Sequence, residues 1–126
     1  PVQTPSDGHL RIVIVEDNGD TRQMLRVALE LSGHEVHDAI DGPGGLDAIL
    51  RERPDLALID IGLPEFDGYE VARKVRGALG GTILLVALTG YGQPDDRRQA
   101  LDAGFDAHLV KPVDPARLFT ILGGLP

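Results

Sequence analysis

Five polar residues of this 126-residue chain follow apolar runs and have side chains that could do chemistry together. Glu16 and Asp17 follow the run at 12–15, and Asp60 follows the run at 56–59. Thr89 follows the run at 83–88, and Lys111 follows a shorter one at 109–110. Three carboxylates, a hydroxyl and an ammonium can together hold a cation and a phosphoryl group. They do so only if the runs are strands that end at one edge of one sheet.

The carboxylates set the chemistry of such an edge. Two carboxylates at about 5 Å repel by roughly 3 kcal/mol at an effective dielectric near 20, so three of them need a neutralising partner. A hard dication with oxygen ligands is the natural partner, and Mg²⁺ commonly combines carboxylates, waters and a phosphate oxygen. An aspartate can then act as the nucleophile that forms an acyl phosphate. Lys111 and Thr89 could hold the phosphoryl oxygens by charge and by hydroxyl donation.

The elements that must position these residues alternate along the chain. Apolar and β-branched runs predict strands at residues 9–15, 35–40, 56–60, 82–89 and 107–110. Capped amphipathic segments predict helices at residues 19–32, 43–52, 68–79, 94–103 and 115–122. This alternation predicts a parallel sheet with right-handed crossovers and helices on both faces. The carboxyl ends of parallel strands share one edge, where open α/β folds build their sites.

The helix predicted at 19–32 has an apolar stripe at helical spacing, and Asn18 or Asp20 is its expected N-cap. The predicted stripe consists of Thr21, Leu25, Ala28 and Ser32, flanked by Met24 and Leu31. The segment at 35–40 places Val36 and Ile40 among polar residues, which predicts an edge strand. Asp67 is the expected cap of the helix at 68–79.

Composition narrows the function classes. The formal net charge of −8 argues against a broad basic surface for nucleic acid or an anionic membrane. The chain has no cysteine, so it has no disulfide or thiolate metal site, and a reducing, cytoplasmic location is expected. No apolar run approaches the roughly 20 residues that span a bilayer. Residues 1–8 are predicted to be a linker or a cloning remnant, and residues 9–126 one domain.

In this order, the residues resemble a response-regulator receiver domain, the phosphoacceptor module of two-component signalling. Glu16 and Asp17 match the family's acidic pair, and Asp60 matches its phosphorylated aspartate. Thr89 and Lys111–Pro112 match the hydroxyl residue and the Lys-Pro pair, and the loop residues at 63–64 and 67–68 match as well. The resemblance covers about residues 10–122. It implies a flavodoxin-like (βα)₅ three-layer sandwich with a five-stranded parallel sheet in the order 2-1-3-4-5.

The resemblance also implies a function. Asp60 would take a phosphoryl group from a phosphohistidine on a histidine kinase or a histidine phosphotransfer domain. Mg²⁺, with Mn²⁺ as the alternative, would bind Glu16, Asp17, Asp60 and the main-chain carbonyl of Gly62. The Lys111–Pro112 peptide bond would be cis. An isolated domain would catalyse only its own phosphorylation and dephosphorylation, and would be a monomer or weak dimer. Segments 87–93 and 104–112 resemble receivers of hybrid sensor kinases, so two origins are expected for the chain: a stand-alone regulator, or a piece of a hybrid sensor histidine kinase.

Two surfaces carry the remaining expectations. The partner is expected to dock on the first helix, where Arg22, Gln23 and Arg26 lie off the buried stripe, and on the loop at 113–114. His108 stands three residues before the lysine, where the family usually has Tyr or Phe. It is either a switch acting with Thr89 or an ordinary edge-strand histidine. His9, His34 and His37 show no ligand spacing, so the sequence predicts surface histidines and no zinc site.

Three alternatives fit parts of the pattern. A flavodoxin-type FMN carrier needs a Ser/Thr/Gly phosphate loop after the first strand, but residues 16–20 are acidic and would repel a phosphate. An aspartyl phosphatase of the haloacid-dehalogenase type needs an Asp-x-Asp motif after that strand, which Asp17-Asn18-Gly19 is not. A pseudo-receiver that only binds partners would lack at least one of the five site residues, and none is missing here.

Overall fold

The computed structural model describes residues 9–63, 67–90 and 94–123, and in them strands and helices alternate strictly. The strands are β1 (Arg11–Val15), β2 (Glu35–Ala39), β3 (Leu56–Asp60), β4 (Leu84–Thr89) and β5 (Ala107–Val110). The helices are α1 (Gly19–Leu31), α2 (Gly42–Glu52), α3 (Gly68–Leu79), α4 (Pro94–Ala103) and α5 (Pro115–Gly123). Every strand pair is parallel and the order is β2-β1-β3-β4-β5, so the predicted flavodoxin-like fold is confirmed.

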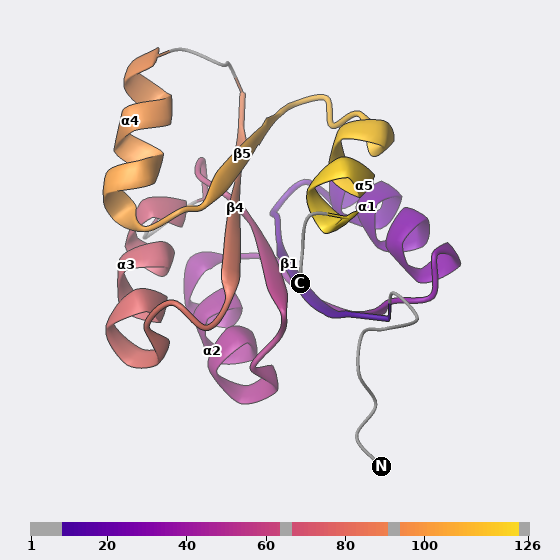
Figure 1. The fold of residues 1–126 in the computed structure, drawn as a ribbon, viewed down its shortest axis with the longest axis horizontal. Helices are drawn as coiled ribbons and strands as arrows, with labels where there is room; N and C mark the ends of the chain where they lie inside the picture. Colours follow the sequence, from indigo (N-terminus) through magenta and orange to yellow (C-terminus); the bar gives the residue numbers. More distant parts are fainter. Residues whose placement is uncertain (1–8, 64–66, 91–93, 124–126) are drawn as a thin grey trace.

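The sheet lies between two helical layers (Figure 1). Helices α1 and α5 pack on one face, while α2, α3 and α4 pack on the other. The central strand β3 shows why both faces are apolar. Leu56 and Leu58 join the core under α1 and α5, and Ala57 and Ile59 join the core under the other three helices. Because β3 is buried on both faces, its run of apolar residues has no alternation.

Short polar side chains fix where the helices begin. The side chain of Asn18 accepts a hydrogen bond from the amide of Thr21 at 2.9 Å, so Asn18 rather than Asp20 caps α1. Asp67 accepts from the amide of Glu70 and caps α3 as predicted. These caps decide how the chain leaves β1 and enters α3, the two connections that border the carboxyl edge of the sheet.

The buried stripe predicted for α1 is partly wrong. Leu25 and Leu29 are its buried residues, whereas Ser32 is exposed and Leu31 is 83% exposed. Leu25 and Leu29 are one turn apart and point at the sheet together, and the predicted stripe missed Leu29. Ile40 was also expected to belong to the edge strand, but β2 ends at Ala39 and Ile40 is 60% exposed.

A glycine lets α2 approach β1 just below the acidic pair. A Cβ atom on Gly45 would lie 2.5 Å from Cγ1 of Val15, which is closer than side chains tolerate. Val15 is the residue directly before Glu16, so this contact fixes the end of β1 against α2. Gly45 therefore weakens the helix slightly, but its missing side chain allows α2 to pack closely against the end of β1, next to the site.

The structure tests one predicted peptide bond, while some of the predicted segments lie outside the residues that it describes. The Lys111–Pro112 peptide bond is cis, as the resemblance implied. The predicted linker at 1–8, the end of the domain at 124–126 and Pro64 lie outside the described residues. Within the residues that are described, no helix combines the length and the apolar character needed to cross a membrane.

Candidate functional site

The sheet brings the five predicted residues to one edge. Asp60 is the last residue of β3, the strand between β1 and β4. Glu16 directly follows β1, Thr89 ends β4 and Lys111 directly follows β5. Because all five strands are parallel, these residues come from the carboxyl ends of four neighbouring strands. The convergence expected from the sequence is therefore present.

Lys111 connects two of the carboxylates. Its Nζ lies 2.7 Å from Oε1 of Glu16 and 3.1 Å from Oδ2 of Asp60. Glu16 has no solvent exposure and Asp60 is 6% exposed, so neither carboxylate can rely on water for its solvation. Oε1 of Glu16 has no other polar partner among the described residues. One half-buried ammonium thus supplies the positive charge for two buried acids.

Burial and pairing act against each other in the pKa values of this pair. Burial raises the pKa of Glu16 above its usual value, although the hydrogen bonds from Lys111 and from the amide of Asn18 oppose that shift. Burial also lowers the pKa of Lys111, but its contacts with Glu16 and Asp60 outweigh burial and leave that pKa raised. Lys111 therefore stays charged at neutral pH, and the acids beside it are the reason.

A backbone amide binds the other oxygen of the Asp60 carboxylate. The amide of Gly62 donates a hydrogen bond to Oδ1 at 2.9 Å, so the two oxygens of Asp60 have different partners. The chain then turns so sharply that a Cβ atom on Gly68 would lie 2.5 Å from the carbonyl oxygen of Asp60. The Asp67-Gly68 pair that matched the family loop thus has a physical role, since only glycine fits at the second position.

The acidic cluster suits a dication. Carboxylate oxygens of Glu16, Asp17 and Asp60 all lie within 4.8 Å of one another, and Asp17 is exposed. Lys111 offsets one of these three negative charges, so the described side chains leave an oxygen-only donor set with excess negative charge. That set fits Mg²⁺ or Mn²⁺. The amide of Gly62 contacts Asp60, but no contact among the described residues tests the role of its carbonyl. That carbonyl therefore stays a predicted ligand.

The two predicted switch residues differ in setting. Thr89 is 1% exposed, and its hydroxyl makes a long 3.5 Å hydrogen bond to the carbonyl of Leu109. His108 is half-buried on the edge strand β5, opposite Ala87 of β4. Burial lowers the pKa of His108, and the charges of Arg97 and Arg117 lower it further. Among the described residues, the hydroxyl of Thr89 bonds to the carbonyl of Leu109 and not to His108.

Two residues support Glu16 through contacts that the sequence did not predict. The amide of Asn18 donates to Oε2 of Glu16 at 3.0 Å, so the cap of α1 also orients the buried acid. Arg22 donates from Nη1 to the main-chain carbonyl of Glu16 at 3.0 Å and lies 3.7 Å from Asp38. Arg22 is six residues beyond Glu16, and only the position of α1 against the sheet brings the two together. Sequence spacing alone carries no signal for this contact.

With this geometry established, comparison with known proteins identifies the family. Residues 12–123 match the model of the response regulator receiver domain. Response regulator MprA of Mycobacterium tuberculosis is 39% identical over 103 residues, which are 82% of this chain. The chain belongs to the response regulator receiver domain family. The match spans 44% of the length of MprA, so it concerns less than half of that relative.

Solved structures agree with the assignment. The receiver domain protein (CheY-like) from Methanospirillum hungatei JF-1 is 34% identical, with a TM-score of 0.83 over 90% of each chain. The receiver domain of sensor histidine kinase PA1611 from Pseudomonas aeruginosa PAO1, with a magnesium ion in its active-site cleft, is 33% identical. Its TM-score is 0.82 over 90% of this chain and 94% of that one. The protein is thus a phosphoacceptor module of two-component signalling, and nothing supports the flavin or phosphatase alternatives.

Proposed function

We propose that Asp60 accepts a phosphoryl group from a phosphohistidine, with Lys111 and Thr89 holding the transferred group. The observation that carries this proposal is the position of Asp60, whose Oδ1 accepts from Gly62 and whose Oδ2 faces Lys111. These contacts orient the carboxylate before any donor arrives, which reduces the entropy cost of transfer. In the transfer, a bond forms between Asp60 and phosphorus and the phosphorus–nitrogen bond of the donor breaks. The electron pair leaves on the donor imidazole, which takes up a proton.

Mg²⁺, or Mn²⁺ in its place, fits the oxygens of Glu16, Asp17 and Asp60 with the Gly62 carbonyl as a further ligand. The bound ion supplies positive charge that offsets both the acidic cluster and the incoming phosphoryl oxygens. Lys111 is already within reach of Asp60 and contributes the second positive charge. Among the described residues, the Thr89 hydroxyl has only a long hydrogen bond to give up, so it can turn toward a phosphoryl oxygen at little cost.

The wider biological setting is part of the same proposal. The donor is a histidine kinase or a histidine phosphotransfer domain in the cytoplasm, and the isolated domain catalyses only its own phosphorylation and dephosphorylation. Residues 9–126 form the receiver unit, with 1–8 as a linker. The family match at 12–123 supports these bounds, and the likeness to the receiver of a sensor histidine kinase supports a hybrid kinase as the parent chain. A monomer or weak dimer, with no contact to nucleic acid or membrane, accords with the net charge of −8.

The donor is proposed to dock on α1 and on the loop at 113–114, beside the acidic edge, where Asp114 is exposed and Val113 is buried. The structure changes which side chains suit this role. Arg26 lies 3.0 Å from Asp38 and 3.2 Å from Glu30 on the helix surface, and Gln23 is exposed. Arg22 instead supports the carbonyl of Glu16. Arg26 and Gln23 are thus the better candidates for direct contact with the donor.

Intact-mass measurement tests the acceptor. Incubation with a small acyl-phosphate donor and Mg²⁺ is expected to add one phosphoryl group to the wild type and none to Asp60→Asn. Asp47→Asn is the matched control, because Asp47 is an exposed acid on α2 that pairs only with Arg51 in the described structure. The control is expected to be labelled like the wild type. If Asp60→Asn were labelled as fully as the wild type, another residue would be the acceptor.

A further inference from the structure

A second group of possible metal ligands lies away from the acidic site, at the edge formed by β2 and the end of α2. Glu35 and His37 belong to β2, and Glu52 is the last residue of α2. Their ligand atoms all lie within 4.8 Å of one another. Nε2 of His37 is 2.7 Å from Oε2 of Glu35 and 3.5 Å from Oε1 of Glu52. All three residues are half-buried.

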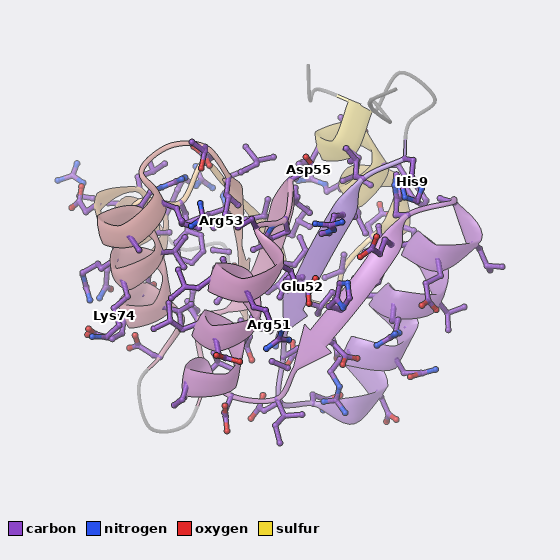
Figure 2. The ribbon with its side chains drawn as sticks, turned by 90° about the horizontal axis from the view of Figure 1, so that it is seen from below. His9, Arg51, Glu52, Arg53, Asp55 and Lys74 are labelled. Atoms are coloured by element: carbon purple, nitrogen blue, oxygen red, sulfur yellow. The ribbon has the colours of Figure 1, made fainter. Side chains whose placement is uncertain are left out.

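The fold explains why these three side chains meet. Glu35 and His37 are two residues apart on one strand, so they point to the same face of the sheet. His37 pairs with Val13, whose side chain belongs to the core under α2, so this face is the one that α2 covers. Helix α2 ends at Glu52, and Arg53, its C-cap, adopts a left-handed φ of 47°. Figure 2 shows Glu52 at that end of α2, beside the sheet.

We propose that Glu35, His37 and Glu52 form a second metal site, which binds a divalent transition-metal ion of the Zn²⁺ class. An imidazole nitrogen with two carboxylate oxygens is a mixed donor set, which favours such ions over Mg²⁺. In a tetrahedral site with bonds of about 2.1 Å, the ligand atoms are separated by roughly 3.4 Å. The gap between His37 and Glu52 already has this size, and the gap between His37 and Glu35 needs to open by less than 1 Å.

Two arginines contact the carboxylates of the group. Nε of Arg11 lies 3.2 Å from Oε2 of Glu35, the same oxygen that faces His37, and its Nη1 donates to the carbonyl of Glu52 at 3.0 Å. Nε of Arg51 lies 3.2 Å from Oε2 of Glu52, which leaves Oε1 of Glu52 facing His37. Such outer contacts orient ligands, as they do around known metal sites. Three protein ligands leave a fourth position for water.

The two sites are separate. Arg11 of β1 lies opposite Glu35 of β2, and it comes five residues before Glu16 along the chain. Five residues of strand span roughly 16 Å, which separates the level of Glu35 from the level of Glu16. The new site is therefore near the amino ends of the strands, and the acidic site is at their carboxyl ends. The sequence predicted no zinc site because the three histidines outside β5 lack ligand spacing. The structure instead pairs one of them with an acid fifteen positions further on.

A titration with Zn²⁺ in excess Mg²⁺ tests the proposal, since Mg²⁺ fills the oxygen-only site. Calorimetry of the wild type is expected to show one Zn²⁺ per chain, with the His37 imidazole ¹⁵N signals shifting on saturation. His37→Ala should lower the affinity at least thirtyfold, and Glu52→Gln at least tenfold. His34→Gln is the matched control, because His34 is a half-buried neighbour outside the group, and its affinity should stay within twofold of the wild type.

Phosphorylation of the variants distinguishes loss of the metal site from loss of the fold. His37→Ala and Glu52→Gln should both be phosphorylated at Asp60 like the wild type, which shows that each is folded. Absence of Zn²⁺ binding by the wild type below about 1 mM would overturn the proposal. So would unchanged Zn²⁺ binding in the two variants, which would place the ion elsewhere. Because labelling at Asp60 is measured separately, failure of the zinc site and failure of the phosphoacceptor site give different results.

Discussion

Nζ of Lys111 lies between two acids of different strands, 2.7 Å from Oε1 of Glu16 and 3.1 Å from Oδ2 of Asp60. Glu16 is fully buried, so this ammonium is the main source of compensation for its charge. The same ammonium is proposed to hold a phosphoryl oxygen once Asp60 is modified. Lys111 therefore has a structural task in the unmodified protein and a chemical task during transfer. The two tasks can be separated by experiment.

Replacement of this lysine by an apolar side chain tests the structural task. Lys111→Met leaves two buried carboxylates without their cation, and we expect unfolding to become easier by about 3 kcal/mol without Mg²⁺. Added Mg²⁺ should recover part of this loss, because a dication at the acidic cluster restores positive charge. Urea denaturation with and without Mg²⁺ measures both values, and labelling by a small acyl phosphate should be strongly slowed.

Lys74→Met is the matched control, since Lys74 is the other lysine of the chain. Lys74 lies on α3, half of its side chain is exposed, and its closest acid is Glu70 at 3.7 Å (Figure 2). An exposed pair of this kind contributes at most about 0.5 kcal/mol, so stability and labelling should stay near the wild type. Similar losses in both variants would show that Lys111 has no special electrostatic role.

Asp17 offers a different test of the cation site, because it is exposed and has no close contact with Lys111 in the described structure. Asp17→Asn should weaken Mg²⁺ binding at least tenfold, about 1.4 kcal/mol, through the loss of one charged ligand. It should also raise the stability of the metal-free protein by up to about 1 kcal/mol, since repulsion within the cluster falls. Melting curves at several Mg²⁺ concentrations give both effects. A normal Mg²⁺ shift in the variant would remove Asp17 from the site.

The two arginines of α1 should behave differently with two donors. Arg26→Glu changes the proposed docking surface, so it should slow transfer from a phosphorylated histidine domain at least fivefold and spare a small acyl phosphate. Arg22→Glu removes the hydrogen bond to the carbonyl of Glu16, so it should slow both donors. Rates of phosphoprotein formation with each donor decide this. Equal slowing by Arg26→Glu with both donors would argue against docking at that residue.

The fold and the main site residues could be predicted because each depends on a strong local pattern. Continuous apolar runs mark buried parallel strands, and one polar residue directly after a run marks the carboxyl edge. Asp60 and Thr89 could be placed in this way. The resemblance to receivers added their roles and the cis bond. The described part of the chain confirms the placement, and the roles stay predictions.

What could not be predicted depends on contacts between elements. The support of the Glu16 carbonyl by Arg22 follows from the rotation of α1 on the sheet, which the predicted stripe did not capture because it missed Leu29. The approach of Glu52 to His37 likewise requires the end of α2 to lie over the edge strand. Side chains fifteen residues apart come into contact only through the packing of the helix on the sheet, which no spacing rule in the sequence describes.

The setting of His108 predicts how the stability of the protein depends on pH. Its pKa is lowered by burial and by Arg97 and Arg117, so the folded state favours the neutral ring. The neutral ring contributes stability above the unfolded pKa of about 6.5, and this contribution is lost as the pH falls through the folded pKa. The free energy of unfolding should therefore decrease more steeply below pH 6.5 in the wild type than in His108→Gln. If the free energy of unfolding had the same slope with pH in both proteins, His108 would not contribute to the pH dependence.

The same histidine is predicted to report phosphorylation. When Thr89 turns toward a phosphoryl oxygen, it gives up its long bond to the carbonyl of Leu109, the residue next to His108. His108 also borders a cavity of about 380 Å³ with Arg117, Thr120 and Ile121, so the ring has space to move. A phosphoryl mimic at Asp60 should then shift the NMR signals of the His108 ring and change its titration, while His34 stays unchanged. If the His108 ring has the same signals and titration with and without the mimic, the signal leaves Asp60 by another route.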